Sequence, residues 1–223
     1  MKRYVLQANK SAIEDYFEIS NGSQSGFEKD FNILPGAEVP IIISQNGSRK
    51  ILNANWGLPA GMFGNDFYAV QQTVVLKDDK LKKLAETSAC IIPASGFYKW
   101  KETVHDPLPF YLRVLSKEIL PLAGIYTAVK DEKGNLTYSF AVITMPANAL
   151  VEPLDKSMPC IVEPSDLNKW LGGGALKMLE KGFNGQYLLP DMAVYRVPDL
   201  VNNPENNSRE LIQPIPKLRE DDD

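Results

Sequence analysis

The sequence predicts an α+β fold in which short strands dominate and helices are few. Apolar runs of four to eight residues recur along the chain, and Gly, Pro, Asn or Asp residues separate them. Helix signals occur in only three places, and no internal repeat of fixed period is present. Together these patterns favour a sheet-rich chain with a few short helices.

Strands are predicted at ten places along the chain. They are Tyr4–Gln7, Glu38–Ser44, Lys50–Trp56, Ala89–Ile92, Gly96–Lys101, Pro109–Val114, Leu120–Val129, Thr137–Met145, Pro159–Val162 and Met192–Val197. Asn46-Gly47 and Lys133-Gly134 are typical of tight hairpin turns, because both residue pairs tolerate positive φ angles.

Three segments carry helix signals. Ser11 and Glu14 have the spacing of a capping box, so a helix is expected to start at Ser11. A second helix is predicted from Asp78 to Thr87, with leucines on one face and lysines on the other. Ser165 is expected to cap a third, short helix that contains Trp170.

Length and composition favour one soluble domain over residues 1–223, because 44% of the side chains are hydrophobic and 23% are charged. The acidic stretch at about 216–223 is expected to be a solvated tail. No apolar stretch approaches the ~20 residues of a membrane span, and the first residues do not resemble a secretion signal. We therefore expect a cytoplasmic monomer that does not bind a membrane.

The net charge of −4 and the pI near 5.2 exclude a general attraction to nucleic acids, so any DNA contact must be local. Cys90 and Cys160 lie in apolar runs and are expected to be buried without a disulfide. The single histidine, His105, falls in a polar connection and is expected at the surface. No glycine-rich phosphate loop or metal-ligand spacing is present, so neither a cofactor nor a metal is predicted.

Three segments have unusual residue patterns, and each allows two interpretations. Trp56 stands among glycines at a strand exit, where it could cap the core or form a stacking platform for a base. Lys99 lies between aromatic residues as either a solvated edge residue or a desolvated amine with a lowered pKa. Thr144, Asn148 and the loop with Asp155 could form a pocket wall or an ordinary turn.

These segments occur in the order of a known family's signatures. They are Asn32-Ile33-Leu34-Pro35, Asn55-Trp56-Gly57-Leu58, Ile92-Pro93-Ala94-Ser95-Gly96-Phe97-Tyr98-Lys99-Trp100, Thr144-Met145-Pro146-Ala147-Asn148 and Ser157-Met158-Pro159. In this order they resemble the SOS response-associated peptidase family, and the match extends from Arg3 to Ile215. The Ile-Pro-Ala-Ser-Gly-Phe-Tyr segment is the most specific of them.

The resemblance implies a curled, barrel-like and mostly antiparallel sheet with short peripheral helices. It also implies a groove for single-stranded DNA around an abasic site. In the family, an N-terminal cysteine condenses with the ring-opened sugar to form a thiazolidine crosslink. The positions implied to contact DNA are Arg3, Pro35, Gly36, Trp56, Thr144 and Asn148.

The family's reactive positions are all substituted in this chain. The chain begins with Met1 and Lys2, whereas the family has a cysteine after its first methionine. The bulky Lys2 is expected to leave Met1 uncleaved. Tyr68 stands at the asparagine position, Lys99 at the glutamate position and Asp155 at the histidine position. Two arginine positions are also changed, to Val70 and Ser157, which predicts weaker DNA binding than in typical relatives.

Three functions remain open at this stage. The first is a protein that binds abasic or intact single-stranded DNA without thiazolidine crosslinking. The second is an enzyme in which the Met1 amine, Lys2 or Lys99 forms an imine with an aldehyde while Asp155 moves protons. The third is a groove that now holds a peptide, a small molecule or a protein. Cleavage of other proteins is not expected, because no serine or cysteine is paired with a histidine.

Overall fold

The computed structural model describes residues 1–19, 26–64, 67–130 and 134–216. Five strands close into a ring: β4 (Ser48–Trp56), β3 (Glu38–Gln45), β6 (Ala89–Ala94), β9 (Leu120–Lys130) and β10 (Leu136–Pro146). The ring closes through pairing of β10 with both β9 and β4, and only the β10–β4 pair is parallel. The predicted barrel-like, mostly antiparallel fold is therefore confirmed.

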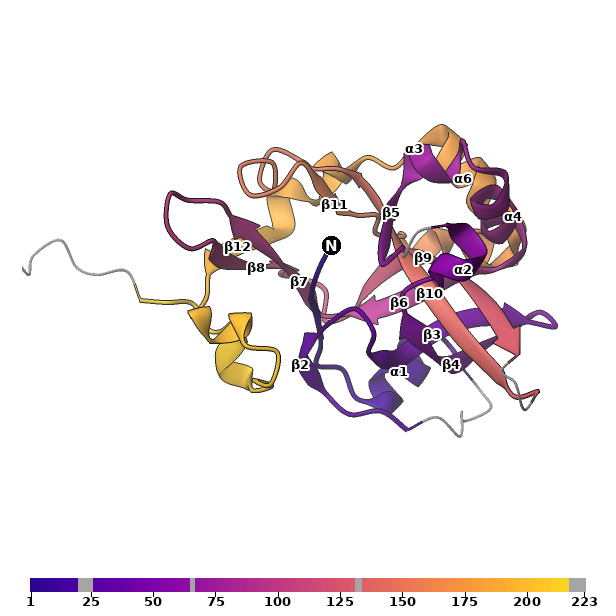
Figure 1. Cartoon of the computed structure of the whole chain (residues 1–223), viewed down its shortest axis with the longest axis horizontal. Helices are drawn as coiled ribbons and strands as arrows, with labels where there is room; N and C mark the ends of the chain where they lie inside the picture. The colour runs from indigo at the N-terminus through magenta and orange to yellow at the C-terminus, as the bar shows by residue number, and fades with distance from the viewer. Residues whose placement is uncertain (20–25, 65–66, 131–133, 217–223) are drawn as a thin grey trace, which may run out of the picture.

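Two short strands extend the barrel at β10. β5 (Ala69–Gln71) pairs with it in parallel, and β11 (Ser157–Pro159) pairs with it in antiparallel orientation. A second sheet runs in the order β12 (Met192–Arg196), β8 (Leu108–Val114), β7 (Gly96–Lys101), β1 (Tyr4–Leu6) and β2 (Asp30–Ile33). Figure 1 shows the barrel on one side and this sheet on the other, with the start of the chain between them.

The chain passes from the barrel to the second sheet through a kink between β6 and β7. Ser95 lies at this kink, where its N–H donates to the Val5 carbonyl and its hydroxyl accepts from the Gln7 N–H. Gly96 follows, and a Cβ there would lie 2.4 Å from the Tyr111 hydroxyl. The kink therefore requires glycine, and it fixes β1 against both parts of the fold.

Helices cover the outside of the barrel. They are α1 (Lys10–Tyr16), α2 (Ala60–Phe63), α3 (Gln72–Val75), α4 (Asp79–Thr87), α5 (Leu167–Lys169), η2 (Trp170–Gly174) and α6 (Ala175–Lys181). Single turns occur at η1 (Pro164–Asp166), η3 (Gly185–Asp191), η4 (Asp199–Asn202) and η5 (Arg209–Ile212). Figure 1 shows α3, α4 and α6 gathered at one end of the molecule.

Two predicted helix caps were wrong. The first helix is capped by Asn9, whose side chain accepts from the Ala12 N–H, so Ser11 lies inside the helix. Near the third helix, Glu163 rather than Ser165 precedes the first turn, and it makes no side-chain cap. The predicted helix from Asp78 to Thr87 is confirmed, and Asp78 is its cap, because its carboxylate accepts from two N–H groups of the first turn.

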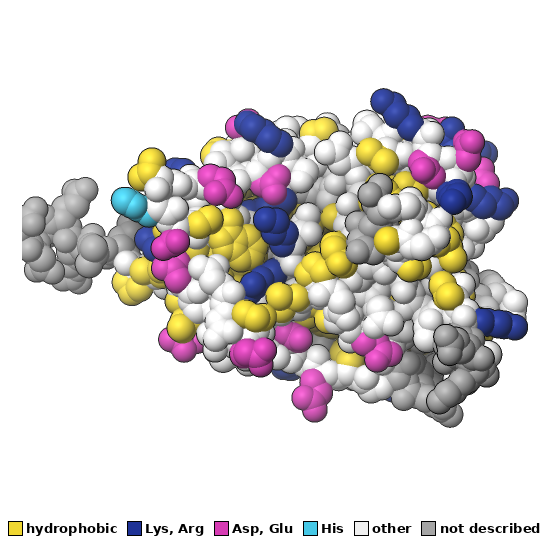
Figure 2. All heavy atoms as spheres, in the orientation of Figure 1, with side chains coloured by type: hydrophobic (Ala, Val, Ile, Leu, Met, Phe, Trp, Pro, Cys, Tyr) yellow, Lys and Arg dark blue, Asp and Glu magenta, His cyan; other side chains and the backbone are white. Residues whose placement is uncertain are grey.

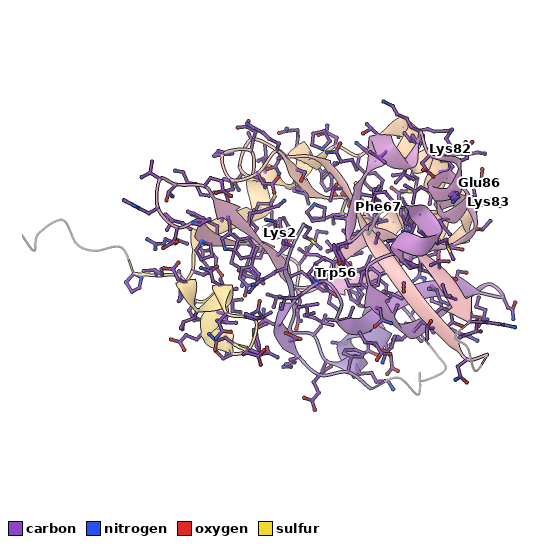
Figure 3. All side chains as sticks on the ribbon, viewed as in Figure 1. Lys2, Trp56, Phe67, Lys82, Lys83 and Glu86 are labelled. Atoms are coloured by element: carbon purple, nitrogen blue, oxygen red, sulfur yellow. The ribbon has the colours of Figure 1, made fainter. Side chains whose placement is uncertain are left out.

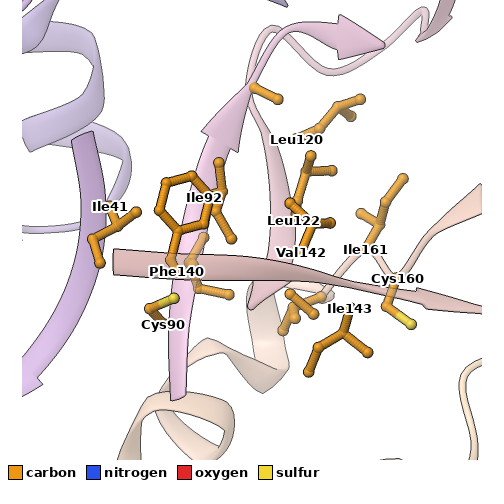
Figure 4. Packing of buried hydrophobic residues seen from close by; sticks show 14 of the residues in the cluster. Ile41, Cys90, Ile92, Leu120, Leu122, Phe140, Val142, Ile143, Cys160 and Ile161 are labelled. Carbon is orange, nitrogen blue, oxygen red and sulfur yellow. The ribbon is translucent and has the colours of Figure 1, made fainter. Parts of the chain in front are cut away.

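The main hydrophobic core is apolar and includes both cysteines. Figure 4 shows Cys90 and Cys160 among branched aliphatic side chains and Phe140. Both thiols are free and buried, and burial raises the pKa of each. They act as small hydrophobic residues, as predicted, and neither can reach a ligand at the surface.

Other predictions are also settled by the fold. Asn46 and Gly47 both have positive φ and connect β3 to β4, which confirms the first hairpin turn. Lys133 and most of the acidic tail lie outside the described residues. His105 is exposed in the connection between β7 and β8. Within the described part of the chain, no helix is long and apolar enough to cross a membrane.

Candidate functional site

The start of the chain lies in the middle of one face of the molecule. β1 is held between β2 and β7, with Tyr4 opposite Ile33 on one side and Phe97 on the other. Met1 is half-buried and packs against the main hydrophobic core, while Lys2 is exposed. Figures 1 and 3 place the N-terminus and Lys2 between the second sheet and the barrel.

Lys99 and Asp155 form an ion pair beside this terminus. Lys99 lies on β7, only 3% of its side chain is exposed, and its Nζ is 2.7 Å from Asp155 Oδ2. The other carboxylate oxygen accepts hydrogen bonds from the N–H and hydroxyl of Ser157. Lys99 is therefore the desolvated amine that one sequence interpretation predicted, and not a solvated edge residue.

The pair alters the pKa of both partners. Burial lowers the pKa of Lys99, and the hydrogen bond and charge of Asp155 offset only part of this effect. Burial tends to raise the pKa of Asp155, but hydrogen bonds from Lys99 and Ser157 outweigh it, so the net pKa is below 3.8. Asp155 is therefore a carboxylate at neutral pH.

Of the three groups, the Met1 amine is the one whose pKa shift matters most for the chemistry of the site. Burial and the nearby positive charge of Lys99 lower its pKa from 8.0 to about 5, while Asp155 acts in the opposite direction. An amine with this pKa is unprotonated at neutral pH, and its lone pair is free to attack a carbonyl carbon. The site thus combines a neutral amine, a buried ammonium group and a carboxylate.

Trp56 is a core residue, which corrects the expectation that it forms a stacking platform. Its side chain is fully buried and packs between the rings of Tyr4 and Phe140, with centroids 5.2 and 6.4 Å away. Its indole N–H donates to the Tyr68 carbonyl at 2.7 Å. No face of this ring is open to a ligand.

Three other expected DNA contacts also have internal partners. The Arg3 guanidinium donates to the carbonyls of Val201 and Asn202 and to the Asn32 side chain. Thr144 is buried and donates to the Val70 carbonyl. These side chains organise the walls of the site and do not project into it.

Asn148 is likewise buried, and it links two loops of the same wall. Its Nδ2 donates to the Gly185 carbonyl, and its Oδ1 accepts from the N–H groups of Leu150 and Val151. Pro35 is half-buried, whereas Gly36 is exposed with a φ of +90° and donates its N–H to the Trp56 carbonyl. Of these six positions, Gly36 is exposed, Arg3 and Pro35 are half-buried, and the other three are buried.

Tyr68 lies on the barrel side of the site, immediately before β5. Its side chain is 40% exposed, unlike the neighbouring Trp56. A small cavity of about 130 Å³ lies further along the same segment. Its lining consists of Gln71, Gln72, Thr73, Thr144, Met145, Pro146, Lys156 and Ser157.

Sequence reasoning singled out half of this lining, Thr144 to Pro146 and Ser157, and missed the rest. Gln71 and Lys156 carry no motif of their own, and only their nearness in sequence to Tyr68 and Asp155 could have indicated them. Figure 2 shows lysine or arginine side chains in the middle of this face, with hydrophobic side chains on both sides and acidic ones around them. Among the described residues, no group of acidic, cysteine or histidine side chains could hold a metal ion.

Comparison with known proteins identifies the fold and the family. The family model described as SOS response associated peptidase (SRAP) matches residues 2–204. The chain belongs to the SOS response associated peptidase family. Its similarity to a solved structure from Bacteroides thetaiotaomicron has a TM-score of 0.80 at 19% identity, and covers 96% of this chain and 100% of that one.

Curated members of the SOS response associated peptidase family are also similar over most of the chain. The abasic site processing protein YoqW of Bacillus subtilis is 27% identical, and the match covers 95% of this chain and 98% of YoqW. The abasic site processing protein HMCES of Rattus norvegicus is 22% identical, with 84% of this chain and 65% of HMCES covered.

Both partners of the ion pair occupy positions that the resemblance to the family marks as reactive. Lys99 stands where the resemblance places a glutamate, and Asp155 where it places a histidine. The structure shows the two substituted side chains in direct contact, at 2.7 Å. The two positions that the resemblance marks as reactive are therefore in contact with each other in this chain.

Proposed function

We propose that this chain recognises abasic sites in single-stranded DNA and binds their open aldehyde through the Met1 amine as a reversible imine. The observation that carries the proposal is the neutral Met1 amine beside the Lys99–Asp155 pair. The names of YoqW and HMCES support the substrate, because both are abasic site processing proteins. The proposal involves no thiazolidine, because that ring needs an amine and a thiol on the same terminal residue, and Cys90 and Cys160 are both buried elsewhere in the chain.

The chemistry follows from the three groups. The Met1 nitrogen attacks the aldehyde carbon, and Asp155 accepts the proton that the nitrogen releases. The ammonium group of Lys99 stabilises the developing negative charge on oxygen, in a site where burial strengthens the interaction. Asp155 then returns this proton to the alkoxide oxygen, which completes the carbinolamine. Loss of water from the carbinolamine gives the imine, and addition of water reverses it.

Non-covalent affinity for DNA is expected to be weak. Val70 is buried and Ser157 is bound to Asp155, so neither of the two former arginine positions supplies a cation. Lys2 is exposed and remains available for backbone phosphates, whereas Lys156 is exposed but pairs with Glu152. Reversible imine formation with the Met1 amine would lengthen the time that the weakly bound DNA stays on the protein.

Borohydride trapping tests the proposal, because reduction converts an imine into a stable secondary amine. We expect a trapped adduct with abasic single-stranded DNA, and peptide mapping should place it on Met1. N-terminal acetylation should abolish it, since the amide nitrogen is not nucleophilic. Intact-mass measurement of each preparation confirms the state of the terminus.

Each outcome of this experiment has a distinct meaning. An adduct on Lys2 or Lys99 would support imine chemistry but would show that Met1 is not the nucleophile. A crosslink that survives without reductant would contradict reversibility. No adduct, together with no binding to abasic or intact strands at low salt, would remove DNA as the ligand and favour a peptide or small-molecule ligand.

A further inference from the structure

Tyr68 is fixed to the barrel through its backbone. Its carbonyl oxygen accepts two hydrogen bonds, from the Trp56 indole N–H at 2.7 Å and from the Val142 N–H at 3.1 Å. Both donors belong to barrel strands, β4 and β10. The position of this residue on the surface is therefore as rigid as the barrel itself.

The Tyr68 ring lies across Gly57 and is open on its outer side. Gly57 has a φ of +143°, and a Cβ there would be 2.8 Å from Cε1 of the ring. The ring therefore packs directly on the glycine backbone, yet 40% of the side chain remains exposed. Among the described residues, Tyr187 is the only other aromatic side chain with comparable exposure.

A short chain of contacts connects Tyr68 to the reactive terminus. Tyr4, three residues after Met1, packs edge-on against Trp56, and Trp56 donates to the Tyr68 carbonyl. Figure 3 shows Lys2, Trp56 and Phe67, the residue before Tyr68, in the central part of the view. Tyr68 is thus held to the barrel by the same indole against which Tyr4, close in sequence to Met1, packs.

We propose that Tyr68 is a stacking platform for the nucleobase next to the abasic site, an inference that rests on the proposed function. A base beside an abasic nucleotide has lost one stacking neighbour, so one of its faces is free. A rigid exposed tyrosine ring can replace that neighbour, and stacking tolerates any base because every base has a π face. Tyr68 would thereby favour strands with an abasic gap.

The test uses a tetrahydrofuran abasic analogue, which has no aldehyde and reports binding without imine formation. Two strands are compared, one with adenines flanking the analogue and one with further tetrahydrofuran units in their place. Wild-type protein should bind the first strand about tenfold more tightly. Tyr68→Leu should lose this preference, and Tyr68→Phe should retain it.

Tyr187→Leu is the matched control, because it removes an equally exposed ring whose hydroxyl bonds to the Ile161 carbonyl. It should leave the preference unchanged, and thermal unfolding should show that each variant is folded. Equal losses for Tyr68→Leu on both strands would overturn the stacking role. If wild-type protein binds neither the analogue nor a true abasic strand, the proposed function itself fails.

Discussion

At the scale of single residues, the two partners of the Lys99–Asp155 ion pair differ strongly in burial. Lys99 is 3% exposed, whereas 41% of the Asp155 side chain is exposed. Removal of Lys99 returns a carboxylate to water, but removal of Asp155 strands a buried ammonium group, which is the costlier change. Asp155 is therefore the partner whose loss alone should destabilise the site most.

The Met1 amine makes stability depend on pH. Its pKa is 8.0 in the unfolded reference and about 5 in the folded chain. Between these values the unfolded chain binds a proton that the folded chain does not, so the free energy of unfolding should rise as pH rises from 5 to 8. Urea unfolding at several pH values measures this slope.

N-terminal acetylation provides the control for the pH experiment, because the acetylated chain has no amine to titrate. The slope between pH 5 and 8 should become smaller after acetylation. An identical slope in both proteins would show that the amine has the same pKa in the folded and unfolded states. The Met1 site would then be more hydrated than the structure indicates.

At the scale of elements, the turn after β4 determines where the Tyr68 ring lies. The strand ends at Trp56, and Gly57 turns the chain with its N–H bonded to the Phe140 carbonyl. The sequence predicted this strand and the glycine-rich exit. It left open whether Trp56 would be internal or a stacking platform, because its hydrogen-bond partner and both of its ring neighbours come from other parts of the chain.

Gly57→Ala should disturb this exit in two ways. The φ of +143° is unfavourable for alanine, and the new Cβ would lie within 3 Å of the Tyr68 ring. We expect a loss of about 1–3 kcal/mol in the free energy of unfolding. Binding to the tetrahydrofuran strand with flanking adenines should also weaken, since the ring must move.

Gly61→Ala is the matched control for this prediction. Gly61 lies in α2, and nothing is within 4 Å of a Cβ added there. Alanine favours a helix, so stability should be unchanged or slightly higher. If denaturant unfolding shows the two alanine variants to be equally stable, the packing of Tyr68 on Gly57 is not as close as described.

At the scale of the whole molecule, the two ends of the chain are joined. Asn32 and Arg3 donate to backbone carbonyls of residues 201–206, and Trp100 donates to the Asn202 side chain. A separate apolar cluster that includes Val5, Tyr98 and Leu211 lies beneath them. The C-terminal segment thereby holds β1, and with it the position of the Met1 amine.

Arg3 and Lys2 are adjacent but should respond to mutation in opposite ways. Arg3→Met removes several hydrogen bonds to internal carbonyls, so stability should fall by about 1–3 kcal/mol with little change in the salt dependence of DNA binding. Lys2→Met should leave stability intact and reduce the salt slope by about one unit. Denaturant unfolding and binding titrations at several salt concentrations separate the two effects.

The opposite pattern would reverse these assignments. A reduced salt slope in Arg3→Met without loss of stability would restore Arg3 as a phosphate contact. Unchanged binding in Lys2→Met would show that DNA passes over another part of the surface.

Local sequence patterns predicted most of the sheet but less of the site. Alternating apolar residues and turn residues identified strands such as β3, β7 and β9 to within two residues. β2 and β5 were missed, because they are short and gain their stability from partners elsewhere in the chain. Lys99 could be singled out from the sequence, but only the fold brings Asp155 to it.

The place of the first residue has a practical consequence for anyone who produces this protein. An affinity tag or fusion partner ahead of Met1 would convert the amine into a peptide nitrogen. It would also place extra residues beside Lys99 and Asp155. Material purified in that way should appear inert toward aldehydes even though it is correctly folded. Recombinant versions should therefore carry their tag at the other end, or have it removed so that Met1 comes first.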